Sequence, residues 1–171
     1  MPVIPLIEKV RVFRTEKAIA LRACRGYVEV EFAAKSGNTF RRSAVVDLGA
    51  PFSVIPYSLW HDKDIPWQPL GAPVTGEETA QPSPLSWFGV PCQMGDAQVW
   101  LVDAATEIRS RLLRVRAKLP SARVSSHAEK EVILGYDFLA ANAITLRCGQ
   151  EWAGLTAYCW WTKAAFRRFI P

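Results

Sequence analysis

The sequence predicts a mainly β fold in a single domain, residues 1–171. Half of the residues are hydrophobic, so the chain is long enough for one well-buried core and short for two. Its 12 prolines and 10 glycines separate short runs of β-branched and aromatic residues, a pattern that favours strands over a helical bundle. Two apolar segments, residues 45–55 and 132–139, carry an acid or a glycine at the end of such a run.

The N-terminal part is expected to hold one or two strands, with Val10–Phe13 the best candidate. Tyr27–Phe32 then alternates polar and apolar residues, Ser36–Asn38 supplies a turn, and Phe40–Val46 follows as the return strand. The pattern predicts a β-hairpin.

The segment that follows this hairpin places Asp47 at the end of an apolar run, directly before a small turn that contains Gly49. A second apolar run, Ser53–Ile55, comes next. A strand can deliver an acid to a tight loop in this way. An aspartate before a glycine is also a routine turn former, so the pattern alone leaves a catalytic and a structural role open.

The middle of the chain predicts a connector and two strands. Pro56–Pro69 is rich in turn residues, with Ser58–Trp60 as a single helical turn. Leu85–Pro91 and Ala97–Val102 are expected to be strands around a turn at Gln93–Asp96.

Beyond these strands, Asp103 is expected to form a turn or cap a helix, and residues 104–113 are expected to form a short helix. Residues 114–119 alternate basic and apolar side chains, as on a strand with one buried face. Ser121–Lys130 is a polar loop.

The second apolar segment predicts a strand that begins at Glu131 and ends at Gly135, followed by a short helix over Tyr136–Ala141. Asp137 is expected to cap this helix or to pair with a neighbour. Ala143–Cys148 follows as a strand.

Residues 149–171 form an aromatic C-terminal extension. Tyr158, Trp161, Ala165 and Phe169 fall at helical spacing on one face, which is compatible with a C-terminal helix. Such a stripe packs on the protein's own core, on a second subunit or, next to basic residues, at a membrane surface. Base rates favour the core.

Together, the two apolar segments resemble the motifs of the retropepsin-like aspartic proteases. In that family an Asp-Thr-Gly-Ala or Asp-Ser-Gly-Ala loop is followed by a flap hairpin, an Ile-Leu-Gly strand and a short helix. Asp47, Gly49 and Ala50 match the first motif, and Ile133–Gly135 matches the second. The resemblance covers residues 26–148.

The resemblance implies a retropepsin-like acid-protease barrel in which Asp47 is the catalytic acid. Leu48, Gly49 and Ala50 would form the supporting loop. The family's flap falls within Leu70–Ala80, for which an ordinary surface loop is an equally good interpretation. The residues of the candidate flap are Val74, Thr75, Gly76 and Glu77.

Two departures from the family pattern are visible. Leu48 stands where the family carries Thr or Ser, whose hydroxyl makes a hydrogen bond across the dimer. Pro51 and Tyr136 stand where retroviral members carry an Asp and an Arg that pair. Loss of both partners together is tolerable, because only a single buried charge left alone is costly. The departures indicate a divergent member.

Aspartic proteolysis needs two carboxylates that share one proton. Because the chain offers one such motif, the resemblance implies a homodimer in which each subunit contributes Asp47. The nucleophile would be water, so no cofactor and no metal are expected. The first hypothesis is an endopeptidase that acts on peptides or proteins. The alternative, favoured by Leu48, is a weak or inactive dimer that binds extended peptides.

Composition limits the other partners. The net charge is +5, and the basic excess gathers within residues 109–123, where an exposed strand face explains it. Aromatic residues and helix-turn-helix signals are not interleaved with these charges, so no nucleic-acid partner is expected. We also expect no membrane-surface partner.

The sequence favours a reduced, cytoplasmic protein. It shows no apolar run of signal-peptide or membrane-spanning type. The four cysteines are widely spaced, which argues against a disulfide framework. The two histidines, His61 and His127, are expected in solvated loops and give little material for a metal site.

Overall fold

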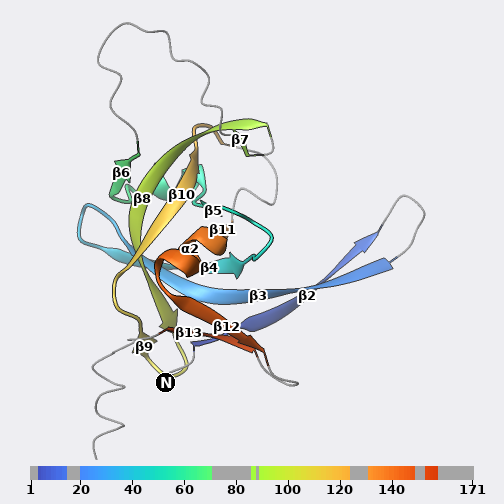
Figure 1. Cartoon of the computed structure of the whole chain (residues 1–171). Coiled ribbons are helices and arrows are strands. Elements are labelled where there is room, and N and C mark those ends of the chain that lie inside the picture. The colour runs from blue at the N-terminus through green and yellow to red at the C-terminus, as the bar shows by residue number, and fades with distance from the viewer. Residues whose placement is uncertain are drawn as a thin grey trace, which may run out of the picture.

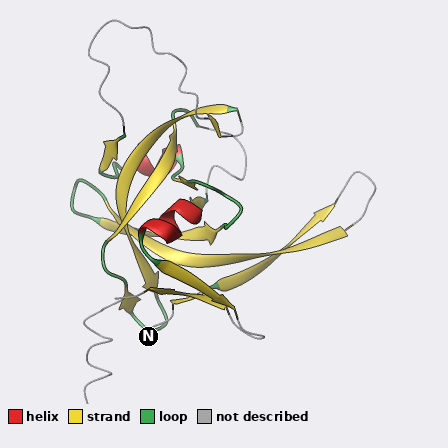
Figure 2. Cartoon of the chain, viewed as in Figure 1, coloured by secondary structure: helices red, strands yellow, loops and turns green. Residues whose placement is uncertain are grey.

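The computed structural model of the chain is mainly β with two short helices in its described part, as the sequence predicts (Figure 1, Figure 2). The structure describes residues 4–14, 20–70, 86–87, 89–123, 131–148 and 153–157. The helices are α1 (Tyr57–Trp60) and α2 (Tyr136–Ala141). The strands are β1 (Ile4–Pro5), β2 (Ile7–Arg14), β3 (Ala20–Ala33), β4 (Thr39–Val46), β5 (Ser53–Val54), β6 (Trp67–Pro69), β7 (Ser86–Trp87), β8 (Val90–Asp103), β9 (Ile108–Arg109), β10 (Leu113–Pro120), β11 (Val132–Leu134), β12 (Ile144–Cys148) and β13 (Ala153–Ala157).

Six strands close into a barrel in the order β3, β4, β11, β5, β10 and β8. The ring closes because β3 pairs with β4 along one edge and with β8 along the other, where Val30 lies opposite Leu101. Side chains alternate between the two faces of a strand. The inward-facing side chains of the barrel, such as Val30, Phe32, Val99 and Leu101, are fully buried.

Strand β11 positions the candidate site because it lies between β4 and β5. It runs parallel to β4, with Leu134 opposite Val46, and antiparallel to β5, with Ile133 opposite Val54. The chain therefore leaves β4, passes the end of β11 and returns as β5 on its other side. Asp47 lies on this connection between β4 and β5.

A second sheet joins the two ends of the described chain. In it, β13 lies between β1 and β12 and runs antiparallel to both. Ile4 and Leu155 of this sheet are buried in the same hydrophobic cluster as the barrel side chains. Strands β2 and β3 form a long antiparallel ribbon that extends away from the barrel (Figure 1). Residues on both sides of 26–148 thus belong to the folded body.

The strand predicted at Leu85–Pro91 is wrong as a single strand, because Ser86–Trp87 of β7 pairs antiparallel with Val90–Pro91 at the start of β8. The turn predicted at Gln93–Asp96 is wrong as well, because β8 runs unbroken through it. Gly95 is opposite Ala117 of β10 and Pro69 of β6. A Cβ at Gly95 would overlap the ring of Trp67, so the glycine serves close packing and not a turn.

The helix predicted over residues 104–113 is also wrong. Asp103 ends β8 and forms a turn, because its carboxylate accepts hydrogen bonds from the Ala105 amide (3.1 Å) and the Thr106 hydroxyl (2.5 Å). Strand β9 then pairs back onto β8, and β10 begins at Leu113. The prediction of Asp103 as a turn former is confirmed.

Several local predictions are confirmed. The hairpin of β3 and β4 has the expected turn, where Gly37 adopts φ +85°. Helix α1 contains the predicted turn at residues 58–60, and α2 spans Tyr136–Ala141 as predicted. Strand β10 alternates exposed and buried residues. Among the described residues, no helix has both the length and the apolar character needed to span a membrane.

Candidate active site

The loop after β4 holds Asp47 through its backbone. The Asp47 amide donates to the carbonyl oxygen of Leu134 at 3.0 Å, which ties the loop to the end of β11. Its carboxylate oxygen Oδ1 accepts a hydrogen bond from the Gly49 amide at 2.9 Å, and its carbonyl accepts one from the Ala50 amide at 3.2 Å. The Asp47 side chain is half-buried. The result is an oriented carboxylate that solvent can reach.

The two apolar segments of the sequence meet at Gly135. The Tyr136 amide donates to the carbonyl oxygen of Ala50 at 2.9 Å. A Cβ at Gly135 would lie 2.7 Å from that oxygen and 2.8 Å from the carbonyl oxygen of Phe52. Only glycine allows the backbone of the loop to approach the start of α2 this closely.

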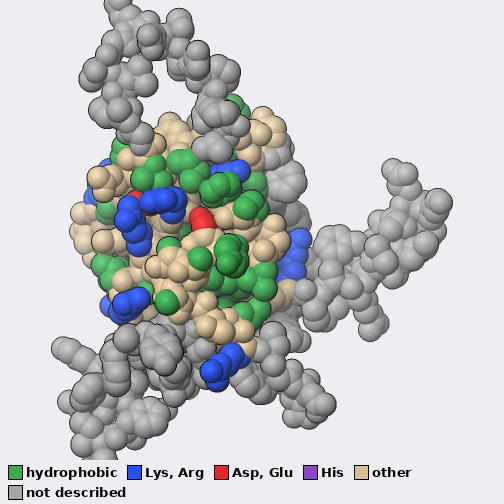
Figure 3. Space-filling model, in the orientation of Figure 1, with side chains coloured by type: hydrophobic (Ala, Val, Ile, Leu, Met, Phe, Trp, Pro, Cys, Tyr) green, Lys and Arg blue, Asp and Glu red, His purple; other side chains and the backbone are tan. Residues whose placement is uncertain are grey.

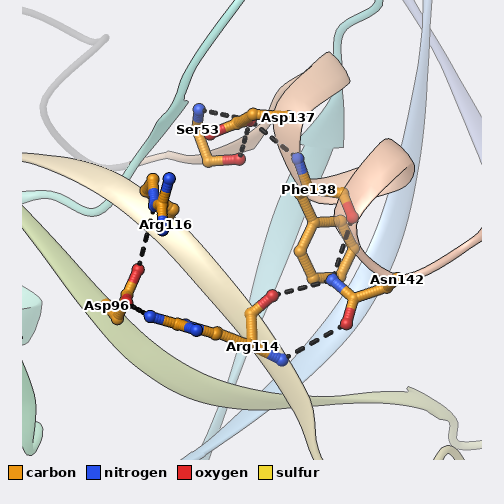
Figure 4. Close-up of polar contacts among 7 residues, drawn as sticks. All are labelled: Ser53, Asp96, Arg114, Arg116, Asp137, Phe138 and Asn142. Carbon is orange, nitrogen blue, oxygen red and sulfur yellow. Dashed lines mark hydrogen bonds and ion pairs between the residues drawn. The ribbon is translucent and has the colours of Figure 1, made fainter.

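A buried serine at the start of β5 connects the end of the acid loop to α2 through hydrogen bonds (Figure 4). Ser53 is fully buried, and its hydroxyl donates to Oδ1 of Asp137 at 2.9 Å while accepting the Gly135 amide at 3.0 Å. The same carboxylate oxygen accepts the Ser53 amide at 2.9 Å and the Phe138 amide at 2.8 Å. Asp137 therefore joins the loop to α2, across 84 positions of sequence.

Sequence reasoning did not single out Ser53 for the site. It predicted that Asp137 would cap α2 or pair with a neighbour, and the pairing is confirmed. Nothing local marks this serine, since its partner is distant in sequence. The signal available in the sequence is Asp137 itself, because an acid two positions after Gly135 lies in the first turn of α2 and can accept hydrogen bonds from a neighbouring segment.

Replacing Asp137 by Ala is expected to lower the free energy of unfolding by about 2–4 kcal/mol, because hydrogen bonds to a charged acceptor are lost and buried donors remain. Ser53→Ala should cost less, and the double variant should cost less than the sum of the two. Urea denaturation of the three variants measures this coupling. Strictly additive losses would show that the two side chains do not act as a unit.

Large apolar side chains are exposed around the acid loop. The exposed fractions are 53% for Leu48, 36% for Phe52 and 62% for Tyr136. The ammonium group of Lys118 lies 4.8 Å from the centre of the Phe52 ring. In Figure 3, hydrophobic side chains gather near the middle of the face that carries α2. The acid is thus bordered by apolar surface that a single chain leaves uncovered.

Among the described residues, the other titratable candidates do not assemble into a site. His61 is exposed, contacts Asp62 at 3.1 Å and stacks on Tyr57, as expected for a solvated loop histidine. Burial raises the pKa of the Cys92 thiol, which disfavours a nucleophilic thiolate. Within the described residues, no three His, Cys, Asp or Glu side chains group as metal ligands do.

Part of the predicted site lies outside the described residues. The candidate flap residues Val74, Thr75, Gly76 and Glu77 belong to the segment between β6 and β7 that the structure does not describe. His127 and the aromatic stripe from Tyr158 to Phe169 also lie outside the described residues. Of the predicted site residues, Asp47, Leu48, Gly49 and Ala50 are all on the one loop described above.

No protein-family model matches the chain, and neither a curated protein nor a solved structure does. Chemically, the loop presents one oriented carboxylate beside exposed apolar surface. A single carboxylate can act as a base on water, but it cannot also donate a proton to a substrate carbonyl at the same moment. An aspartic dyad at this loop would require a second carboxylate beside Asp47.

Proposed function

We propose that the chain is an aspartic-type endopeptidase of retropepsin type that works as a homodimer. The observation that carries the proposal is the meeting of the two motif segments. The Asp47 amide donates a hydrogen bond to the carbonyl of Leu134, and the Tyr136 amide donates one to the carbonyl of Ala50. Two backbone hydrogen bonds therefore join the acid loop to the end of the Ile-Leu-Gly segment. The closed six-stranded barrel and the short helix after Gly135 are compatible with this fold type.

The homodimer follows from the chemistry of the acid. Two Asp47 carboxylates close to a two-fold axis would share one proton, since like charges at that distance cannot both ionise. One carboxylate would take a proton from water while the other donates to the carbonyl of the peptide bond. The exposed side chain of Leu48, beside the acid, would be covered by the second subunit.

In a second candidate function, the same dimer surface beside Asp47 binds peptides without cleaving them efficiently. Leu48 has no hydroxyl to donate across the dimer, and it is exposed rather than buried under the loop. A dimer of this kind would bind extended peptides as an added strand. This candidate and the peptidase differ in turnover, not in fold.

Replacing Leu48 by Thr is expected to raise peptidase activity or to tighten the dimer, because it supplies the hydroxyl that the family pattern has at this position. A gain of up to about tenfold corresponds to one additional hydrogen bond. Cleavage rates and sedimentation at several protein concentrations measure the two properties. If both are unchanged or worse, Leu48 is suited to this protein as it stands.

The proposal is tested by incubating the purified chain with a diverse peptide mixture from acidic to neutral pH and identifying new termini by mass spectrometry. Cuts that require an intact Asp47 would support the endopeptidase. A chain that is dimeric but makes no cuts at any pH would favour the peptide-binding alternative.

A further inference from the structure

The outer face of β10 carries a row of cations. Arg114, Arg116 and Lys118 alternate with the buried residues Val115 and Ala117, so the three basic side chains share one face of the strand. The exposed fractions of the two arginine side chains are 61% and 52%. Alternate residues on a strand are about 6.5–7 Å apart. We call these three residues the basic row.

A buried carboxylate holds part of the row in place (Figure 4). Asp96 on the neighbouring strand β8 is 8% exposed and pairs with both Arg114 and Arg116. The Arg116 pair joins Nε to Oδ1 at 3.3 Å. One acid therefore orders two guanidinium groups, and with Lys118 the row keeps an excess of positive charge toward solvent.

The basic row connects two features of the surface. At one end, Lys118 lies over the ring of Phe52, five positions after the candidate catalytic acid. At the other end, Arg114 lines a cleft of about 650 Å³ between β6, β8 and β10. Two tryptophans, Trp67 and Trp100, also line this cleft. Figure 3 shows Lys and Arg side chains gathered on the side of the face where β8 and β10 lie.

We propose that the basic row and its cleft form a binding site for an extended acidic peptide segment. Carboxylates at alternate residues of such a segment repeat at the same distance as the cations of the row. An apolar or aromatic side chain at the segment's end would enter the cleft beside the tryptophans. The choice of a peptide rests on the proposed function, because the row begins beside the acid loop.

This site would lie apart from the proposed acid dyad and would select substrates by sequence distant from the bond that is cut. Each exposed ion pair contributes little by itself and is screened by salt. Selection therefore depends on several pairs formed together and on the arginines being fixed in advance by Asp96. Binding should weaken steeply as ionic strength rises.

The test uses the full chain with Asp47→Asn, so that binding is measured without cleavage. The probe is a fluorescent peptide with Glu at alternate positions and a terminal Trp, and its affinity is read by anisotropy at low and high salt. Lys118→Glu is expected to weaken binding about tenfold, because it reverses a charge, and Arg114→Gln, which only removes one, about threefold. Arg42→Glu is the matched control, since Arg42 lies on β4 away from the row and is exposed.

Equal binding of the peptide by Lys118→Glu and by the control variant would overturn the proposal. So would tighter binding of a single-stranded oligonucleotide than of the acidic peptide, because the row would then serve a nucleic acid. Cleavage by the wild type without acidic-peptide binding refutes this site and leaves the peptidase standing. Acidic-peptide binding without cleavage supports the site and argues against the peptidase.

Discussion

Replacing Asp47 by Asn is expected to lower peptide cleavage by a factor on the order of 10³ and to leave the chain folded and dimeric. The amide cannot accept a proton from water, whereas it can still accept the hydrogen bond from the Gly49 amide that orders the loop. The loss should therefore fall on kcat, with little change in folding. Kinetics on a peptide identified from the mixture, together with sedimentation and thermal unfolding, measure each part.

The matched control is Asp64→Asn. Asp64 is an exposed carboxylate that pairs with Lys35 at 2.7 Å, and it is not part of the acid loop. The Asp64→Asn variant should cleave peptides at the wild-type rate. Cleavage retained by Asp47→Asn would show that the activity arises elsewhere in the chain or in a contaminant.

Replacing Gly135 by Ala is expected to lower the free energy of unfolding by about 1–3 kcal/mol and to reduce cleavage as well. The added methyl group would meet backbone atoms of Ala50 and Phe52, which cannot turn aside as a flexible side chain can. The acid loop would have to move away from α2. Urea denaturation at a fixed protein concentration measures the loss, since the stability of a dimer depends on concentration.

Gly26→Ala provides the comparison for this variant. The three atoms nearest to its added Cβ would all belong to the Leu6 side chain, whose end lies at 2.8 Å and can shift. The loss of stability should be smaller than for Gly135→Ala. An equal loss in both variants would mean that the contact between Gly135 and the acid loop is not especially tight.

The short-range features of the fold could be predicted from the sequence. The hairpin of β3 and β4 and the strand, glycine and helix over residues 132–141 each depend on patterns within a few residues. Alternation defines the exposed and buried faces of β10 in the same way. These patterns act locally, so they can be seen without knowing which strands become neighbours.

Two of the errors have long-range causes. Gly95 and Asp96 resemble a turn, but Trp67 packs over the glycine and two arginines of β10 pair with the aspartate. Residues 104–113 lack the strand pattern because β9 is only two residues long and is held by its pairing with β8. In both cases the partner strand, and not the local sequence, decides the structure.

The candidate site was predictable in part. Asp47 and its loop could be located from the acid, the glycine and the later Ile-Leu-Gly segment. The bonds that join these segments could not, because the pairing of Ser53 with Asp137 depends on β11 lying between β4 and β5. The basic row was visible as an alternation, but the cleft at its end depends on the neighbouring strands β6 and β8.

The most direct test of the shared acid dyad is to add Asp47→Asn chain to a constant amount of wild type and to measure cleavage after the subunits exchange. If each active site needs Asp47 from both subunits, an equal amount of the variant should reduce the activity to about half, because mixed dimers are inactive. Larger amounts should reduce it further. Activity that stays at the wild-type level while mixed dimers form would contradict a dyad built from two Asp47 carboxylates.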